Sequence, residues 1–196
     1  SEPLLVVNGD RLIEASAVEN VGTTFAESDR PAAMAVIERD DVSRYGVVSL
    51  DGDRVTELVE KPSKEGHGVI NAGIYAFEQR IFEEIEATPR QSGELALTEP
   101  IERLVGQRAV TGVPIEGLWV DATYPWDLLS VAREVLDQGW TSEPESKPGV
   151  WIDEEAAVHD DATLQPPVVV GPDCELAAGA VVGPNVALSR NVTVGP

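Results

Sequence analysis

The sequence predicts an α/β domain followed by a parallel β-helix built from six-residue repeats. Strand-like and helix-like segments alternate over residues 1–138, and large apolar residues recur every six positions from residue 152 to residue 194. Alternation of strands with helices is typical of α/β domains. A strict period of six fits neither a strand, with its period of two, nor a helix, and it is typical of β-helices.

The α/β segment is predicted from runs of apolar and β-branched residues that are separated by turn residues. Asp51-Gly52-Asp53 lies between two such runs and predicts a hairpin turn. We expect the alternation of elements to produce a mostly parallel sheet. Strands are predicted at residues 4–7, 33–38, 47–50, 55–59, 69–77 and 110–115, and helices at residues 14–26, 79–87, 99–106 and 125–138.

The repeat segment spans residues 150–196, and residues 139–149, which are rich in Pro and Gly, predict a linker to it. Three hexads form one coil, and successive coils stack at about 4.8 Å. Small residues two positions before each large apolar residue fit the corners, and Cys174 at such a corner is predicted to be a packed residue. The inward-pointing residues are predicted to be Ile152, Val158, Leu164, Val170, Leu176, Val182, Leu188 and Val194.

The repeat resembles the left-handed β-helix of hexapeptide transferases. This resemblance implies either an acyltransferase or a scaffold that assists folding and forms a homo-oligomeric trimer. Such acyltransferases use a catalytic histidine, and His159 is the sole histidine in the repeat, without a matching motif around it. We therefore favour the scaffold. The chain begins without Met and ends within a repeat, so we expect it to belong to a longer protein.

The charge of the chain excludes several classes of partner. Its 196 residues include 14 Lys and Arg against 35 Asp and Glu, which gives a formal net charge of −21. Such an acidic surface repels phosphate backbones and anionic lipids, so we expect neither nucleic acid nor a membrane as a partner. The absence of a signal peptide and of a long apolar run predicts a cytoplasmic protein. Only three basic residues are lysines, which favours a halophilic source over an ordinary acidic protein.

Two short segments beside predicted strands are candidates for metal or ligand binding. Val6-Val7-Asn8-Gly9-Asp10 ends a strand, and the carboxyl ends of strands face the ligand crevice in open α/β sheets. Asp10 could hold Mg²⁺, which binds a few carboxylates together with substrate phosphates, but Asn-Gly-Asp also suits a simple turn. Gly46, after Tyr45, either exposes its backbone to a ligand or simply starts a strand.

Three further segments carry polar residues beside apolar runs. Glu60-Lys61-Pro62 offers an ammonium group for a phosphate, or a solvated ion pair at a strand end. Asn71 and Gly73 interrupt an apolar strand, and a buried Asn must be hydrogen-bonded, either to a ligand or within the core. Asp121 ends another apolar run and either supplies a second carboxylate to the metal or caps the following helix.

In this order, these segments resemble the sugar-1-phosphate nucleotidylyltransferases. The resemblance extends from residue 4 to residue 136 through the strings VVNGD, YGVV, VEKP, NAGIYAF, GELALTEPIERL and GLWVDATYPWDLLSVARE. It implies part of a Rossmann-like nucleotidyltransferase domain that converts a nucleoside triphosphate and a sugar 1-phosphate to a nucleotide sugar and pyrophosphate. A hexapeptide β-helix after this domain is typical of a subset of the family, including the bacterial bifunctional enzyme that makes UDP-N-acetylglucosamine.

The resemblance also implies roles for individual residues. Asp10 and Asp121 would hold Mg²⁺ as the cofactor, and Lys61 would contact the phosphate of the sugar 1-phosphate. The residues that would hold the sugar, through side chains or backbone, are Tyr45, Gly46, Glu60, Asn71 and Gly73.

The glycine-rich, basic loop that cradles the triphosphate in this family has no counterpart in the sequence. We therefore expect the chain to contain most of the sugar and metal half-site and to release no pyrophosphate by itself. Two alternatives stay open: a bifunctional enzyme with an acetyltransferase in later coils, and a non-catalytic regulatory or scaffold subunit. The sequence does not distinguish glucose from N-acetylglucosamine, or UTP from dTTP.

Overall fold

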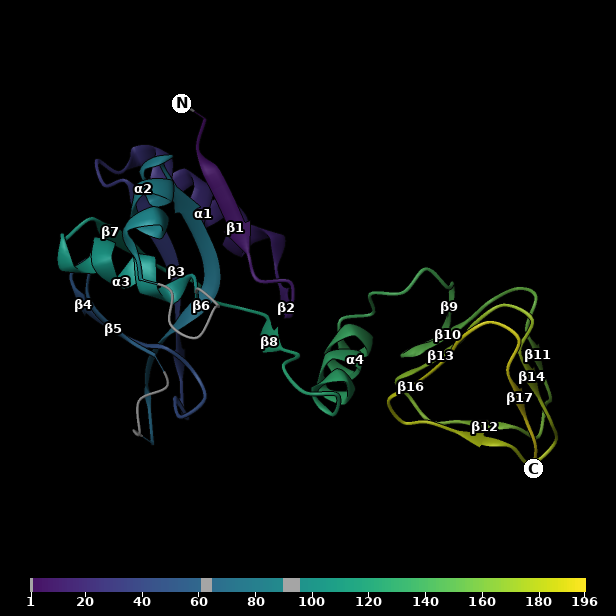
Figure 1. The fold of residues 1–196 in the computed structure, drawn as a ribbon. Coiled ribbons are helices and arrows are strands. Elements are labelled where there is room, and N and C mark those ends of the chain that lie inside the picture. Colours follow the sequence, from purple (N-terminus) through teal and green to yellow (C-terminus); the bar gives the residue numbers. More distant parts are fainter. Residues whose placement is uncertain (1, 61–64, 90–95) are drawn as a thin grey trace. The chain divides into compact units, whose positions relative to one another are not determined.

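The computed structural model describes residues 2–60, 65–89 and 96–196, and the chain divides into two compact units, Ser1–Val120 and Asp121–Pro196. The first unit is drawn in purple to teal in Figure 1. Its elements, with the last strand ending in the second unit, are β1 (Leu4–Val7), β2 (Arg11–Ile13), α1 (Ala15–Glu27), β3 (Ala32–Arg39), β4 (Val47–Asp51), β5 (Arg54–Val59), β6 (Gly68–Phe77), α2 (Arg80–Ala87), α3 (Thr98–Gly106), β7 (Val110–Pro114) and β8 (Trp119–Asp121).

A six-stranded sheet in the order β1-β6-β3-β7-β5-β4 forms the centre of the first unit. Among the described residues, β3 and β7 are the one parallel pair of this sheet, so the prediction of a mostly parallel sheet is wrong. The reason is that β6 follows the β4–β5 hairpin and runs back between β1 and β3, antiparallel to both. Parallel neighbours need a crossover, and α2 and α3 carry the chain from β6 to β7 on the far side of β3.

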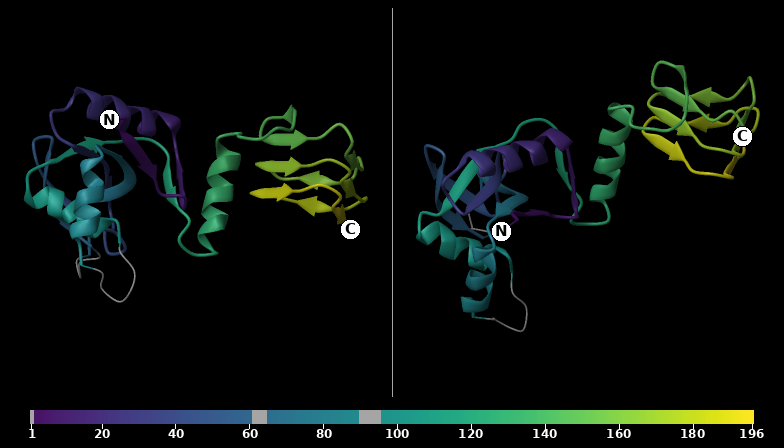
Figure 2. Two further views of the ribbon diagram at one scale, coloured as in Figure 1. Left: turned by 45° about the horizontal axis from the view of Figure 1, so that its top comes forward. Right: turned by 90° about the horizontal axis from the view of Figure 1, so that it is seen from above.

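Different helices cover the two faces of this sheet, as Figures 1 and 2 show. Successive residues of a strand point to opposite faces, so Met34 and Ala35 belong to different cores. Met34 packs in a core that includes Ile81 of α2 and Leu104 of α3. Ala35 packs in a core that includes Val21 of α1. Both faces of the central strands are therefore buried. The strand ends and loops are the places where a ligand could contact this sheet.

The remaining strands of the first unit are short or lie in a hairpin. Asp51-Gly52-Asp53 forms the predicted turn between β4 and β5, which pair in antiparallel fashion. β2 and β8 pair with each other as a separate two-stranded sheet, and neither strand is predicted from the sequence. This small sheet brings residues after β1 close to the segment that leads out of the first unit.

The second unit contains one helix and a stack of short strands, which Figure 2 shows in green to yellow. Residues 145–147, inside the range predicted as a linker, form a strand that pairs with the first strand of the stack in antiparallel fashion. The elements are α4 (Asp127–Asp137), β9 (Glu145–Lys147), β10 (Val150–Ile152), β11 (Ala157–Val158), β12 (Thr163–Leu164), β13 (Val168–Val170), β14 (Glu175–Leu176), β15 (Val181–Val182), β16 (Val186–Leu188) and β17 (Thr193–Val194).

The strands from β10 onward pair in parallel with strands three hexads away in the sequence. Val150 lies beside Val168, and Val168 lies beside Val186. Two further sheets, β11-β14-β17 and β12-β15, follow the same rule. The sulfhydryl of buried Cys174 donates to the carbonyl oxygen of Ser189 at 2.8 Å, which confirms Cys174 as a packed residue. Three sheets therefore surround one apolar interior.

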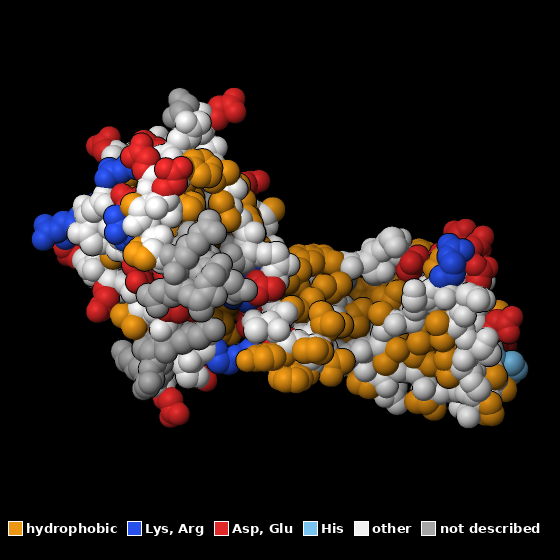
Figure 3. All heavy atoms as spheres, in the orientation of Figure 1, with side chains coloured by type: hydrophobic (Ala, Val, Ile, Leu, Met, Phe, Trp, Pro, Cys, Tyr) orange, Lys and Arg blue, Asp and Glu red, His pale blue; other side chains and the backbone are white. Residues whose placement is uncertain are grey.

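Helix α4 lies within the predicted range 125–138, and several large apolar residues at its start are exposed. Leu136 is buried, whereas Tyr124, Trp126, Leu128 and Leu129 at and before the start of the helix are exposed. Figure 3 shows the resulting apolar patch over this helix. Among the described residues, no helix combines the length and the apolar character needed to cross a membrane.

A polar cluster joins α2 to α3 on the edge of the first core. Glu84 is only 7% exposed. Its two carboxylate oxygens accept hydrogen bonds from Arg103 Nε and Gln107 Nε2, each at 2.9 Å. These bonds hold the pKa of Glu84 below its usual range, with the bond from Gln107 as the larger cause.

We expect Glu84→Gln to lower the free energy of unfolding by about 1–3 kcal/mol at pH 7, because a buried charge-assisted bond is lost. The lowered pKa means that ionised Glu84 stabilises the fold above the unfolded-state value of about 4.3, and that this contribution is lost as the pH falls through the folded-state value. Urea unfolding should therefore show a difference between wild type and variant that shrinks in acid. Exposed Glu86→Gln is the control, and a pH-independent difference would contradict the expectation.

Candidate functional site

The sequence-predicted site residues lie at strand ends and at a kink in one strand. Asp10 lies in the turn between β1 and β2, Gly46 and Tyr45 precede β4, and Glu60 follows β5. The two residues that interrupt the apolar strand, Asn71 and Gly73, lie inside β6, and Asp121 is the last residue of β8. Lys61 lies outside the described residues.

Asn71, Gly46 and Glu60 meet on one side of β6. The backbone N–H of Asn71 donates to the carbonyl oxygen of Gly46 at 2.9 Å. A Cβ atom added to Gly46 would lie 3.0 Å from Oε2 of Glu60 and 3.8 Å from Cβ of Asn71. The absence of a side chain at Gly46 therefore leaves room for the Glu60 carboxylate close to the strand that carries Asn71. Three of the predicted sugar-binding residues form one cluster.

Gly73 connects this cluster to the end of β1. Its φ of 79° lies in the left-handed region, and its N–H donates to Oδ1 of Asn71 at 3.0 Å. Its carbonyl oxygen accepts a bond from the backbone N–H of Asn8 at 2.9 Å. A Cβ atom at this position would lie 2.8 Å from Nδ2 of Asn8. Glycine is thus required by both the backbone angle and the closeness of Asn8.

Tyr75 lies beside the Asn71 amide and is not identified by the sequence reasoning. Nδ2 of Asn71 donates to the Tyr75 hydroxyl at 2.7 Å. The Tyr75 residue is 3% exposed, and its ring stacks on Phe77 with a centroid distance of 5.7 Å. Burial raises the pKa of Tyr75, the bond from Asn71 opposes that shift, and the Glu60 carboxylate adds to it. The hydroxyl is therefore neutral at physiological pH.

Trp119, at the start of β8, packs against several site segments. Its residue exposure is 5%, and its Nε1 donates to the carbonyl oxygen of Ala72 at 2.8 Å. Tyr45 contacts the ring edge-on at a centroid distance of 5.6 Å. The guanidinium carbons of Arg11 and Arg39 lie 5.1 and 4.7 Å from the ring centroid. This indole therefore joins β8 to the Asn71–Gly73 segment and to the residue after Asp10.

The two candidate metal ligands lie in different units of the chain. The Asp10 side chain is 47% exposed and lies 3.5 Å from the Arg11 guanidinium. Oδ2 of Asp121 accepts a bond from the Thr123 hydroxyl at 3.1 Å. Within the described ranges, no group of three or more His, Cys, Asp and Glu side chains is arranged to hold a metal ion. Mg²⁺ needs only one or two carboxylates when substrate phosphates supply other ligands, so each of these two carboxylates is by itself a suitable type of ligand.

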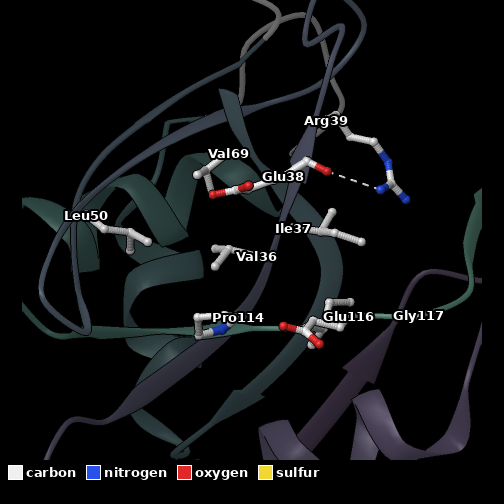
Figure 4. Close-up of a pocket in the computed structure, with 10 residues that line it drawn as sticks. Val36, Ile37, Glu38, Arg39, Leu50, Val69, Pro114, Glu116 and Gly117 are labelled. Carbon is white, nitrogen blue, oxygen red and sulfur yellow. Dashed lines mark hydrogen bonds between the residues drawn. The ribbon is translucent and has the colours of Figure 1, made fainter. Parts of the chain in front are cut away.

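A cavity of about 420 Å³ lies beside β3, β6 and the end of β7, and Figure 4 shows the side chains that line it. Val69, two residues before Asn71, lines it, and Val36 pairs with Asn71 across β3 and β6. The Glu38 carboxylate reaches the wall beside Val69, whereas the Arg39 side chain turns away. The lining residues are Val36, Ile37, Glu38, Arg39, Leu50, Val69, Pro114, Ile115, Glu116 and Gly117.

Comparison with known proteins assigns residues 1–138 to one family model, described as nucleotidyl transferase. The bifunctional protein GlmU of Methanocaldococcus jannaschii is 37% identical over 139 residues, which are 70% of this chain and 32% of that protein. The low-salt glycan biosynthesis nucleotidyltransferase Agl11 of Haloferax volcanii is 30% identical over 66% of this chain and 37% of its own length. The chain thus spans about a third of the length of these relatives.

A solved structure shares the fold of the first part of the chain. It is a Bacillus anthracis protein, provisionally described as a glucose-1-phosphate thymidylyltransferase, in complex with sucrose. The match has a TM-score of 0.58 and an identity of 22%, and it covers 65% of this chain and 52% of the other. At this identity the likeness supports a common fold, a mixed α/β nucleotidyltransferase-type arrangement.

Proposed function

The chain belongs to the nucleotidyl transferase family, and on that premise we propose that it supplies the sugar-phosphate half-site of a sugar-1-phosphate nucleotidylyltransferase. The reaction joins a nucleoside triphosphate to a sugar 1-phosphate and releases pyrophosphate. An oxygen of the sugar phosphate attacks the α-phosphate in line, the bond to the β-phosphate oxygen breaks, and pyrophosphate leaves. The nucleophile is already ionised near neutral pH, so positioning and charge neutralisation carry the catalysis.

In this proposal the chain's residues hold the sugar and its phosphate. Glu60 and Asn71 bind sugar hydroxyls beside the backbone of Gly46 and Gly73, and Lys61 contacts the phosphate. Asp10 and Asp121 would hold Mg²⁺, and such an ion would supply charge neutralisation at the phosphates. The two carboxylates act as ligands and do not need to transfer a proton.

One observation carries the proposal: four segments separated in the sequence come together around Asn71 and Gly73 of β6. The end of β1, the residues before β4, the end of β5 and the kink in β6 all contribute to this cluster. Such a set of convergent polar groups is typical of a small-molecule site rather than of a folding core. The Glu60 carboxylate is exposed, so a ligand can reach it.

Calorimetric titration of the chain with glucose 1-phosphate and N-acetylglucosamine 1-phosphate tests this half-site. We expect Glu60→Gln to weaken the binding of the sugar phosphate by about ten-fold or more, because a hydrogen bond to a charged group contributes about 1.5–3 kcal/mol. Glu57→Gln, an exposed carboxylate on β5, is the matched control and should leave affinity unchanged. Equal affinities of wild type for the sugar phosphates and for inorganic phosphate would contradict a sugar site.

The repeat segment supports a second candidate, a bifunctional protein with an acyltransferase in further coils. We infer that the parallel coils form a left-handed hexapeptide β-helix, and the relative from Methanocaldococcus jannaschii is named a bifunctional protein. His159, the histidine that this reaction would use, has Nδ1 occupied by the backbone N–H of Asp161 at 3.1 Å. The bond from the Asp161 N–H orients the imidazole ring of His159, but it does not itself indicate a substrate-binding role. We therefore keep a trimerising scaffold as the proposed role of these coils.

We further propose the setting in which the protein acts. The domains are residues 1–138 and 150–196 with a linker at 139–149, and the location is a cytoplasm of high salt. The net charge of −21 with only three lysines supports high salt, since screening shortens the range of repulsion between carboxylates.

A further inference from the structure

We propose that Tyr75 is a positioning residue for sugar recognition, and that its hydroxyl fixes the side-chain amide of Asn71 in the orientation that meets the sugar. This inference rests on the proposed function. It concerns a residue that touches no substrate in the proposal and acts through Asn71.

Both ends of the Asn71 amide have a hydrogen-bonding partner. Oδ1 accepts from the Gly73 N–H at 3.0 Å, and Nδ2 donates to the Tyr75 hydroxyl at 2.7 Å. An amide carbonyl oxygen has two lone pairs and an amide nitrogen has two N–H groups. With respect to the part of the chain that the structure describes, each end therefore keeps one further position, an acceptor on Oδ1 and a donor on Nδ2. These positions are what Asn71 can offer to two sugar hydroxyls.

The two contacts agree on one orientation of the amide. If the amide rotated by half a turn, Nδ2 would face the Gly73 N–H, and two donors would oppose each other. The Tyr75 hydroxyl adds a partner at the other end and sets the direction of the second N–H. Without that hydroxyl, one end of the amide loses its anchor and the side chain gains rotational freedom. A sugar would then have to select the productive orientation at the time of binding.

The Tyr75 ring is itself held firmly by the core. It is almost fully buried, stacks on Phe77 at an interplanar angle of 14°, and belongs to the apolar core beneath α2 and α3. Its pKa is raised by burial, so the hydroxyl stays protonated over the working pH range. A rigid aromatic anchor of this kind is the supporting contact that a precise binding site requires.

Tyr75→Phe tests the inference because it removes the hydroxyl and keeps the ring. The matched control is Tyr124→Phe, which removes an exposed hydroxyl in the second unit. We expect Tyr75→Phe to weaken calorimetric binding of glucose 1-phosphate or N-acetylglucosamine 1-phosphate by about ten-fold, the effect of one lost anchoring bond. Binding of inorganic phosphate should be unchanged, which a general loss of structure would not allow.

The side-chain amide resonances of Asn71 give a second readout that needs no ligand. In the wild type, one Nδ2 proton is hydrogen-bonded to Tyr75, so Tyr75→Phe should move that resonance and speed its exchange with solvent. Unchanged resonances, or unchanged sugar-phosphate affinity in Tyr75→Phe, would overturn the inference. If the wild type binds no sugar phosphate, the proposed function is contradicted and the sugar role of Tyr75 is overturned with it. The resonances then still decide whether Tyr75 holds the amide.

Discussion

In the protein encoded by the complete reading frame, replacing Asp10 with Asn is expected to make pyrophosphate release about a hundred-fold slower or more. The substitution keeps the size of the side chain and removes the charge that would bind Mg²⁺ beside the phosphates. Loss of one group that stabilises charge in a transition state typically costs about 10²–10³ in rate. Asp121→Asn should have an effect of the same order. Pyrophosphate release at saturating substrates measures both.

The metal dependence separates a ligand role from a structural one. If Asp10 binds Mg²⁺, part of the activity lost in Asp10→Asn should return as the Mg²⁺ concentration is raised. Asp40→Asn, an exposed carboxylate after β3, is the control and should keep wild-type activity at every Mg²⁺ concentration. Wild-type activity in Asp10→Asn, or a loss that no Mg²⁺ concentration reduces, would contradict the metal-ligand role.

Replacing Trp119 with Ala is expected to lower the free energy of unfolding by about 3–5 kcal/mol, the usual cost of removing a large buried aromatic side chain. The indole is 5% exposed, bonds to Ala72 and lies beneath two guanidinium groups. Each cation–π contact adds about 0.5–1 kcal/mol to the loss. Urea unfolding followed by circular dichroism measures the change.

Trp126→Ala is the matched control for this prediction. Trp126 is 64% exposed, so its removal should cost less than about 1 kcal/mol. The Trp119 variant should also weaken sugar-phosphate binding, since Trp119 holds the carbonyl of Ala72 between Asn71 and Gly73. Equal destabilisation by the two substitutions would contradict a central packing role for Trp119.

The sequence predicts the long strands well because each combines apolar and β-branched residues with clear turn residues at its ends. β3, for example, extends one residue beyond the predicted 33–38 at each end, and β6 begins one residue before the predicted 69–77. β2 and β8 are not predicted because each has three residues and owes its pairing to a partner about a hundred residues away. The alternation of elements gives their order but not strand direction, so the antiparallel course of β6 also escapes prediction.

The residues of the candidate site also fall into two groups, those with a local sequence signal and those without one. Gly46, Glu60, Asn71 and Gly73 carry local signals, since glycines and polar residues stand out beside apolar strands, and the structure brings these four together. The roles assigned to them stay predictions. Trp119 and Arg39 have no local signal, because their contacts come from distant segments.

Tyr75 has a weak signal that the sequence reasoning does not use. It lies four residues after Asn71 in a predicted strand, and residues separated by an even number share one face of a strand. That spacing permits a contact but does not distinguish a hydroxyl that binds Asn71 from one that points to solvent. The contact depends on the kink at Gly73, which only the three-dimensional structure shows.

The proposed nucleotidylyltransferase activity is best tested by measuring pyrophosphate release. The measurement uses the protein encoded by the complete reading frame, in concentrated KCl with Mg²⁺. Glucose 1-phosphate and N-acetylglucosamine 1-phosphate would each be paired with UTP and with dTTP. We expect release with at least one pairing, and that pairing identifies the sugar and the base together. A folded protein that releases no pyrophosphate with any pairing would contradict a nucleotidylyltransferase and would favour a regulatory or scaffold subunit.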